Sequence, residues 1–481
     1  RFHGTDLESE GRWRDGSLVR WRDGSLRPVG GWVDRLGSAP YNAAPRGMLG
    51  WEANDGTRWI AAGTYNKLYA TTGGGTTYDI TPATLTAGTE DATVNTGYGG
   101  GFYGQGFYGQ PVQATGQYSE ATTWSLDNWG QYLVACNPAD GKLWEWQLGT
   151  GSDAAVIANA PTDCLGLVVT EDRFIFALGA DGDPRRIAWC DFEDNTLWAA
   201  ASTNQAGDID LQTSGQIMAG IRTAGQMLIL TDQEAHRSTY VGPPFIHQFE
   251  RVSSACGLIA RKAVVDTPAG VFWMSSAGFF TYDGSAVREI QCDVHDKVFS
   301  DLNQAQISKC WAVSNGPNGE VWFYYPSANS LEIDRYVVFD YKEGHWSMGA
   351  LARTSGFDRG VFKTPVWGDP DGSIYNHETG FNYDGGEVYA ESGPFKIGTG
   401  ENLAVVTSLI PDELNLGDVT TTFKTRLYPT STETSHGPYT MTQPTSVRLQ
   451  GRQVRMKVTG NTPSAWRVGR FRFEAKPGGK R

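Results

Sequence analysis

Residues 58–70 read RWIAAGTYNKLYA: an apolar aromatic run, a Tyr-Asn turn and a second apolar run that carries a tyrosine. Clear copies are YLVACNPADGKLWEW at 132–146, VFWMSSAGFFTYDG at 271–284 and VWGDPDGSIYN at 366–376, and looser copies begin at Phe174, Met227 and Val321. Asn66, Gly141 and Gly372 each stand three positions before an aromatic residue, which suits a tight turn. The stretch therefore predicts a β-hairpin that recurs along the chain.

The copies are spaced at the length of a propeller blade. From the second copy onwards their starts lie 42 to 53 residues apart, whereas the first interval spans 73 residues. A period of about 40–50 residues with several strands per unit is typical of a β-propeller. A β-sandwich, or a pair of them, is the alternative, but it does not require regularly spaced hairpins. We therefore predict an all-β chain in which residues 51–390 form a β-propeller of six or seven blades.

The composition is that of a turn-rich β protein. The 481 residues include 60 glycines, 17 tryptophans and 20 tyrosines, and only 19% are charged. No apolar run approaches the roughly 18 residues of a membrane helix, so we expect a soluble protein without membrane insertion. The start shows no pattern of a secretory signal. Six widely spaced cysteines without a CxxC pair favour buried free thiols over disulfides or zinc.

Residues 1–50 form an arm that contains a tandem repeat. WRDGSLVR at 13–20 is followed directly by WRDGSLRP at 21–28. Each Asp-Gly pair is a strong signal for a tight turn between short apolar runs. We expect two hairpin-like elements ahead of the first blade. Recognition of a ligand by the Arg-Asp pairs is the functional alternative.

The long first interval contains a Gly/Tyr-rich insertion at 85–118, in which GFYGQ occurs twice. Such a segment cannot bury a core of its own, so we expect a loop that projects from the body. A match to GxGxxG within it lacks the strand and helix of a dinucleotide site. The loop is either a plain surface insertion or a contact for a partner or channel. Its candidate contact residues are Tyr98, Phe102, Tyr103, Phe107 and Tyr108.

Residues 391–481 show strict alternation of apolar and basic residues, as in Val-Arg-Met-Lys-Val at 454–458. This period places the apolar side chains on one face and the basic ones on the other, and it predicts a C-terminal β-sandwich with a basic face. From Ser446 to Arg481 there are ten Lys or Arg and one acid, although the whole chain has a net charge of −13. A basic edge on an acidic body suits electrostatic pairing with another subunit or an adaptor. The candidate interface residues are Arg448, Arg455, Lys457, Arg467, Arg470 and Arg472.

Motifs of catalysis are missing from the sequence. HExxH, GxSxG and the phosphate loop GxxxxGK[ST] do not occur, and the seven histidines are scattered singly. The Asp-rich stretches at 181–183 and 369–372 are fragments of a calcium loop, but they suit hairpin turns equally well. The Ser-x-Asp-x-Gly-x-Thr-Trp repeat of sialidase blades is absent, although aromatic residues could stack on sugars. We predict no catalytic, cofactor-binding or metal residues and no cofactor.

An ordered set of short phrases lies between residues 184 and 354. It includes PRRIAWCD at 184–191, NQAGD at 204–208, GQMLILTD at 225–232, YVGPPF at 240–245, GFFTYDG at 278–284 and EVWFYYP at 320–326. Together they resemble the tail-nozzle, or packaged-DNA-stabilisation, proteins of short-tailed bacteriophages. The Gly/Tyr insertion, the WRDGS arm and KPGGKR at 476–481 are also similar to features of that family.

The resemblance implies a structural virion protein, made in the cytoplasm of the bacterial host and located in the phage tail. It implies a homohexameric ring below the portal and adaptor proteins that also contacts tail fibre or needle proteins. Such a ring would continue the DNA channel and retain the packaged genome until ejection, with DNA passing through the lumen without specific binding. We expect the acidic excess to line that lumen, since acidic walls repel phosphate. The alternatives are a carbohydrate-binding or carbohydrate-cleaving propeller used in host adsorption, and a surface or scaffold propeller.

Overall fold

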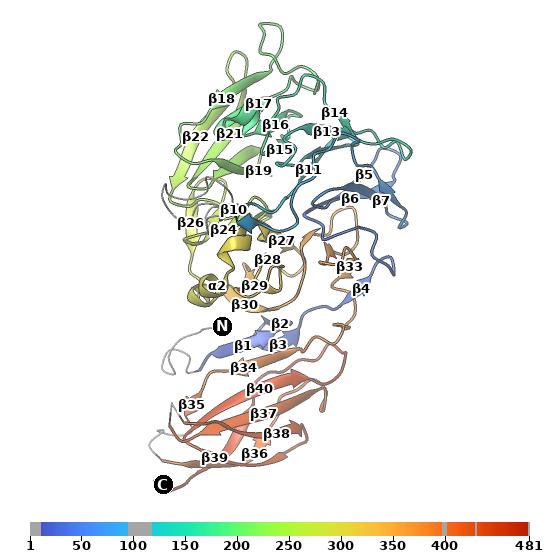
Figure 1. Cartoon of the computed structure of the whole chain (residues 1–481). Helices are drawn as coiled ribbons and strands as arrows, with labels where there is room; N and C mark the ends of the chain where they lie inside the picture. Colours follow the sequence, from blue (N-terminus) through green and yellow to red (C-terminus); the bar gives the residue numbers. More distant parts are fainter. Residues whose placement is uncertain (1–10, 95–117, 397–401, 429–430, 480–481) are drawn as a thin grey trace, which may run out of the picture.

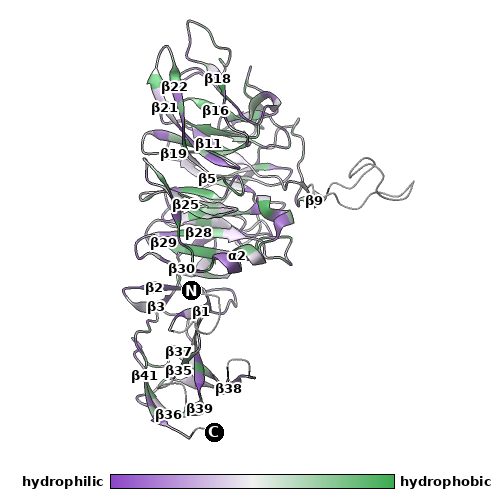
Figure 2. Ribbon diagram, turned by 90° about the vertical axis from the view of Figure 1, so that its left-hand side faces the viewer, coloured by the Kyte–Doolittle hydropathy of each residue, from purple (hydrophilic) through white to green (hydrophobic). Residues whose placement is uncertain are grey.

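The computed structural model describes residues 11–94, 118–396, 402–428 and 431–479. Its strands form two groups along one long axis, a propeller and a set of C-terminal sheets (Figure 1). The N-terminal arm lies between the two groups, and Figure 2, turned by 90°, shows the same elongated arrangement. Strands of the arm pair with both groups, so the arm connects them.

Within the described ranges, the propeller consists of seven antiparallel sheets of four strands each. Blades 1 to 3 contain β5 (Gly47–Glu52), β6 (Arg58–Gly63), β7 (Leu68–Thr72), β8 (Thr77–Asp79); β11 (Ser125–Trp129), β12 (Tyr132–Cys136), β13 (Leu143–Trp146), β14 (Ala155–Val156); and β15 (Gly166–Val169), β16 (Ile175–Leu178), β17 (Arg186–Trp189), β18 (Gly207–Asp210). Blades 4 to 6 contain β19 (Ile217–Thr223), β20 (Gln226–Thr231), β21 (Glu234–Gly242), β22 (Ile246–Ser254); β23 (Val264–Thr267), β24 (Gly270–Ser275), β25 (Gly278–Tyr282), β26 (Val287–Ile290); and β27 (Trp311–Asn315), β28 (Glu320–Tyr325), β29 (Arg335–Asp340), β30 (His345–Ala350). Blade 7 contains β31 (Ser355–Phe357), β32 (Val366–Gly368), β33 (Ile374–His377) and β4 (Trp32–Asp34).

The blades form a closed ring. The first strand of each blade contacts the first strand of the next, in order from β5 round to β31 and back to β5. The closing strand is β4, which comes from the arm and pairs with β33 so that Trp32 lies opposite His377. Blade 7 therefore combines residues 32–34 of the arm with residues 355–377. The three-residue strand β4 closes the ring of blades.

The recurring stretch of the sequence forms the second and third strands of the blades, as predicted. In blade 1, β6 and β7 pair antiparallel with Ala61 opposite Ala70. The turn glycines Gly141 and Gly372 have φ angles of 70° and 85°, in the left-handed region. A Cβ on Gly372 would lie 2.5 Å from the carbonyl oxygen of Tyr41, so a side chain does not fit there. The prediction of an all-β propeller is confirmed, and the blade number is seven in the described part of the chain.

The two copies of the WRDGS octad adopt different structures. The second forms a hairpin of β2 (Val19–Arg22) and β3 (Ser25–Pro28), and the turn between them includes Asp23 and Gly24 at φ angles of 53° and 70°. The first lies in β1 (Trp13–Ser17), which pairs with a C-terminal strand through an irregular register. The expected hairpin at the first Asp-Gly is therefore wrong, because pairing with a distant strand overrides the local turn preference.

The insertion begins and ends at a small two-stranded sheet, β9 (Thr93–Val94) and β10 (Tyr118–Ser119). Just outside it, the backbone N–H of Ala92 donates to Gln306 Oε1 at 2.9 Å and that of Ala121 donates to Ser308 Oγ at 3.0 Å. Both acceptors lie on η2 (Gln304–Lys309), a 3₁₀ segment ahead of blade 6. The base of the insertion, which lies between blades 1 and 2 in the sequence, is thus held by the segment that immediately precedes blade 6.

Residues after Glu387 form two antiparallel sheets. The larger contains β1 with β34 (Tyr389–Ser392), β35 (Phe395–Lys396), β37 (Val419–Arg426), β38 (Thr434–Thr440) and β40 (Gln453–Gly460), and the smaller contains β36 (Ala404–Ile410), β39 (Thr445–Gly451) and β41 (Arg472–Pro477). Buried and partly exposed residues alternate along β37, as period two requires. Residues of both sheets, among them Val406, Leu449, Phe423 and Val458, share one hydrophobic cluster that continues into the arm and blades 6 and 7. The predicted sandwich itself stays a prediction.

The remaining described elements are short. They are η1 (Ala180–Gly182) and α2 (His295–Asp301), which precedes η2 in the link between blades 5 and 6. In the ranges that the structure describes, no helix combines the length and apolar character needed to cross a bilayer. All six cysteines are free thiols; Cys292 is half-buried and the other five are buried. The expectation of buried free thiols is therefore confirmed for five of them.

Candidate functional site

The aromatic residues proposed as partner contacts, Tyr98, Phe102, Tyr103, Phe107 and Tyr108, lie outside the described residues. The other candidate residues, all of them basic, lie in the C-terminal region between residues 448 and 472.

The six basic candidates do not share one surface. Two of them lie on β40 and are paired inside the chain: Arg455 with Glu391 and Glu433, and Lys457 with Glu387 at 2.5 Å. The other four are exposed: Arg448 on β39, Arg472 on β41, and Arg467 and Arg470 between β40 and β41. The alternating pattern located the solvent face of β40 but not the carboxylates that cover it.

Two of the exposed arginines adjoin exposed apolar side chains, and the backbone N–H of the third, Arg470, donates to Asp412 Oδ2 at 2.9 Å. Arg472 lies opposite Ile410 in the sheet, and the backbone N–H of Leu414 donates to the carbonyl oxygen of Arg467 at 3.0 Å. Leu414 is 60% exposed and Leu416 is 47% exposed. We define the C-terminal patch as Arg467, Arg470, Arg472, Ile410, Leu414 and Leu416. Aliphatic side chains beside arginines are typical of protein interfaces.

The C-terminal patch lies beside the arm. Val468 forms isolated β-bridges with both Leu26 of the arm hairpin and Glu413 of the segment that carries Leu414. Arg467 also lines a cleft of about 400 Å³ together with Arg27 and other arm residues. The sequence contains a signal for the patch in Leu-Asn-Leu at 414–416, two leucines two positions apart that follow the strand ending at Ile410. Sequence reasoning missed it because isolated exposed leucines are common.

A carboxyl group with a shifted pKa, that of Glu413, lies next to the patch. Burial raises the pKa of Glu413 to about 7, although the backbone N–H of Gly417 donates to its Oε2 at 3.1 Å. Its Oε1 is buried without a hydrogen-bond partner in the part of the chain that the structure describes. The pKa of this carboxyl is higher in the folded protein than its unfolded value near 4.5. The protein therefore loses stability as the pH rises from 4.5 through 7. The charge next to the patch therefore changes near neutral pH.

We expect Glu413→Gln to stabilise the protein at pH 8 by about 1–2 kcal/mol, a figure reduced for partial exposure, and to leave it unchanged at pH 4.5. Urea denaturation at the two pH values measures this difference. The exposed Glu289→Gln is the matched control, for which we expect no pH-dependent gain. Equal stability changes at pH 4.5 and pH 8 would show that Glu413 titrates normally.

The arm is attached to the propeller by buried ion pairs. Arg20 Nε lies 2.9 Å from Glu320 Oε1, and Arg20 Nη2 lies 2.5 Å from Glu378 Oε1. Arg22 Nη2 lies 3.2 Å from Asp340 Oδ2. Glu320 and Asp340 belong to blade 6, and Glu378 follows the last strand of blade 7. Arg20 and Arg22 of the octad repeat therefore bind carboxylates of the propeller, and Arg22 is the only one of the two that belongs to an Arg-Asp pair.

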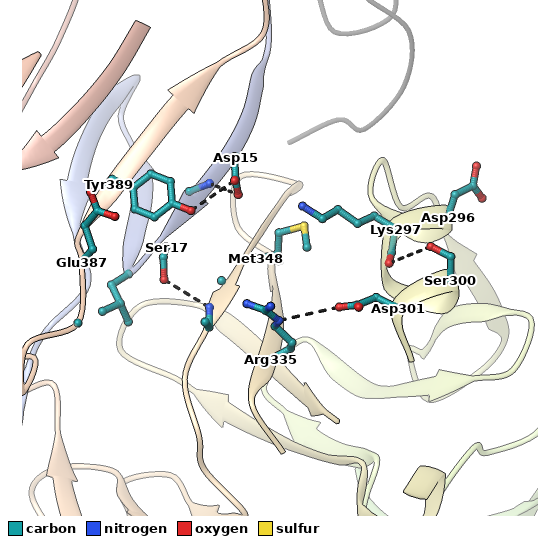
Figure 3. A pocket seen from close by; sticks show the side chains of 15 residues that line it. Asp15, Ser17, Asp296, Lys297, Ser300, Asp301, Arg335, Met348, Glu387 and Tyr389 are labelled. Atoms are coloured by element: carbon teal, nitrogen blue, oxygen red, sulfur yellow. Dashed lines mark hydrogen bonds and ion pairs between the residues drawn. The ribbon is translucent and has the colours of Figure 1, made fainter. Parts of the chain in front are cut away.

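A cavity of about 770 Å³ separates the propeller from the arm and the C-terminal sheets. Figure 3 shows Asp15 and Tyr389 on one side and the side chains of α2 on the other. Tyr389 Oη donates to Asp15 Oδ2 at 3.3 Å, and Asp301 Oδ2 lies 3.9 Å from Arg335 Nε. The lining groups are engaged in structural contacts, and no histidine, cysteine or activated hydroxyl is among the described residues that line the cavity. The cavity therefore lies at the boundary between the propeller and the arm with the C-terminal sheets. Its described lining residues include no nucleophile in contact with a base.

The scattered polar candidates have structural roles. Asp369 Oδ1 accepts from the backbone N–H groups of Asp371 and Ser373, which closes a hairpin turn. His377 lies in the core of blade 7, where burial and the nearby Arg353 guanidinium hold its pKa well below the usual value. Over the residues that the structure describes, no three His, Cys, Asp or Glu side chains cluster in a way that could hold a metal ion.

Comparisons with known proteins concern the fold alone. Virginiamycin B lyase from Staphylococcus aureus has a TM-score of 0.45 and 10% identity, over 72% of this chain and 97% of that chain. A streptogramin B lyase has a TM-score of 0.43 and 12% identity, over 72% of this chain and 96% of that chain. PorZ of Porphyromonas gingivalis has a TM-score of 0.40 and 8% identity, over 79% of this chain and 44% of that chain. No family model and no curated protein matches the sequence.

Proposed function

We propose that the chain is a structural protein of a phage virion, which forms a tail nozzle or hub ring below the portal and adaptor proteins. In this proposal six copies surround the tail axis, continue the DNA channel and retain the packaged genome until ejection. The chain has no catalytic step in this role. The ordered phrases between residues 184 and 354 suggest the proposal, and the geometry of the arm and the C-terminal patch supports it.

The observation that carries the proposal is the C-terminal patch. Three arginines and three apolar side chains lie exposed together on a chain whose net charge is −13. A basic patch on an acidic protein is complementary to the rest of its own surface, and it therefore favours contact with another copy of the chain. The arm supports this role, because its buried ion pairs attach it to the propeller and its strand β1 pairs with β34 of the C-terminal sheets.

Assembly provides the test. We expect the purified protein, or virions that contain it, to show closed rings on the tail axis by electron microscopy. Changing Arg467, Arg470 and Arg472 together to glutamate should abolish ring formation, because like charges then face each other across the interface. The melting temperature of the isolated chain should change little, since all three side chains are exposed.

The matched control carries the same change in net charge on the propeller surface, with exposed or half-exposed Arg173, Arg288 and Arg359 changed to glutamate. It should still form rings. Rings in the patch variant, or isolated propellers for the unchanged protein, would reject the proposed interface. Binding in a glycan array by a monomeric protein would instead favour the carbohydrate-binding alternative.

A further inference from the structure

The central channel of the propeller contains two adjoining cavities, of about 160 Å³ and 210 Å³. Their walls come from the first strands of the blades and the residues just ahead of them, which face the axis of the ring. Lys262 and Val264 line both cavities, so the two spaces meet at this point of the wall. Pockets for drug-sized ligands hold about 300–1,000 Å³, so these cavities suit only a small molecule or ion.

Lys262 is held firmly at the inner seam between blades 5 and 6. Its carbonyl oxygen accepts from the backbone N–H of Ala312 at 2.9 Å, and it forms a parallel bridge with Trp311 at the start of β27. The backbone N–H of Ala263 donates to Ala260 at 2.9 Å, which fixes the turn before β23. The half-buried side chain therefore extends from a rigid position into the channel.

The other basic groups of the channel have partners. Arg46 Nη2 lies 2.5 Å and Lys309 Nζ lies 3.2 Å from Glu332 Oε2. Both cations therefore pair with the carboxylate of Glu332. Lys309 Nζ also lies 2.5 Å from Asp91 Oδ1.

In the second cavity, Arg222 Nη2 lies 2.8 Å from Asp127 Oδ1. Arg261 Nη1 donates to the carbonyl oxygen of Ile217 at 3.2 Å, and its Nε lies 3.7 Å from Glu120 Oε2. Both guanidinium groups are therefore engaged, and Asp127 is already taken by Arg222.

Lys262 differs from all four. Its ammonium group makes no hydrogen bond and no ion pair within 4 Å to any residue that the structure describes. Five basic side chains line the two cavities in the described part of the chain, and the carboxylates of Asp127, Glu120, Glu332 and Asp91 pair with four of them, so the excess is one positive charge, that of Lys262. Burial lowers the pKa of Lys262 to about 8, against the pull of Asp127. A cation that is partly withdrawn from water and has no partner is costly, and an anion beside it lowers that cost.

We propose that the central channel of the propeller binds a small oxyanion, such as sulfate, phosphate or a short carboxylate, at the ammonium group of Lys262. The four other basic side chains are paired with carboxylates, so the ammonium group of Lys262 carries the unbalanced charge of the site. The site is separate from the C-terminal patch and lies inside each single chain. Binding of the anion stabilises the propeller, because it neutralises the charge of Lys262 between blades 5 and 6.

Sulfate is the probe, because it does not titrate between pH 7 and 9. With the full chain in millimolar sodium sulfate, against sodium chloride at equal ionic strength, we expect the melting temperature to rise by about 2 °C or more. Lys262→Met should lose this rise, and the exposed Lys363→Met should keep it. Comparing variants in the same salt removes the general effect of sulfate on proteins. Selenate should give an anomalous peak about 3 Å from Lys262 Nζ in a crystal.

The pH dependence provides a second, independent test. Binding requires the protonated amine, so raising the pH from 7 to 9 should weaken sulfate affinity about tenfold in the unchanged protein. Lys262→Arg keeps its charge throughout and should bind sulfate equally at both pH values. This variant decides the question even if the methionine variant fails to fold. An equal sulfate response in Lys262→Met, or none in the unchanged protein and Lys262→Arg, would overturn the proposal.

Discussion

Replacing Arg20 with alanine is expected to lower the free energy of unfolding by about 3–5 kcal/mol and to release the arm from the propeller. The guanidinium neutralises Glu320, whose side chain is only 3% exposed, and Glu378. Without it, the carboxylate of Glu320 stays buried with only neutral donors, Asn315 and Trp322, within hydrogen-bond distance. Burial already raises the pKa of Glu320, so the loss should be smaller at pH 5, where the carboxyl takes up a proton, than at pH 8.

Urea denaturation gives the free energy, and hydrogen exchange of β2 and β3 reports the release of the arm. Arg27→Ala is the matched control on the same hairpin, because Arg27 pairs with Asp23, whose side chain is 75% exposed. We expect a loss of less than about 1 kcal/mol for this control. In the double variant Arg20→Met with Glu320→Gln most of the stability should return. A loss for Arg20→Ala no larger than that for Arg27→Ala would mean that the ion pairs do not hold the arm.

Replacing Trp32 with alanine is expected to cost about 3–5 kcal/mol, because it removes a buried indole from the strand that closes the ring. Trp32 is 4% exposed, and its Nε1 donates to Asp384 Oδ2 at 2.5 Å. The Arg353 guanidinium lies 4.9 Å from its ring centre, and the ring of His377 lies 5.4 Å away. The loss therefore combines a cavity, a lost hydrogen bond to Asp384 and a weakened stack.

Val33→Ala provides the control within the same three-residue strand. Val33 is 49% exposed, so we expect a change within about 0.5 kcal/mol. Hydrogen exchange should show that Trp32→Ala loosens β33 and β32 before the other blades, since β4 pairs only with β33. Uniform loosening of all blades, or a change as small as that of Val33→Ala, would contradict the role of β4 as the closing strand.

The hairpins of the blades were predictable because the residues that specify each hairpin lie close together in the sequence. A turn residue such as Gly141 or Gly372 and the flanking aromatic runs lie within about 15 residues, and the structure uses them as the sequence indicates. The long first interval also had a local cause, an insertion that begins and ends at β9 and β10. The repeats therefore identified the propeller without information on the contacts between blades.

Pairings between distant segments were not predictable from one sequence. The three residues of β4 are too short to show a period, and β1 contains an Asp-Gly pair that locally favours a turn. The same limit applied to the candidate site. Alternation placed Arg455 on one face of β40, but it could not reveal Glu391 across the sheet, and a single lysine such as Lys262 has no pattern that marks an unpaired charge in a channel.

The way in which the arm joins both groups of strands also constrains the order in which the chain can fold during synthesis. Trp13 pairs with Ser392, and Asp34 pairs with Tyr375, so these strands of the arm find their partners only after the blades between them have been synthesised. Blades 1 to 6 contain only neighbouring strands and can form as they emerge. β1 and β4 must wait for partners that lie more than 340 residues further along the chain, and closing such a long loop carries an entropic cost. The pairing of β4 with β33, and not the formation of any single blade, is therefore the event that closes the ring of blades.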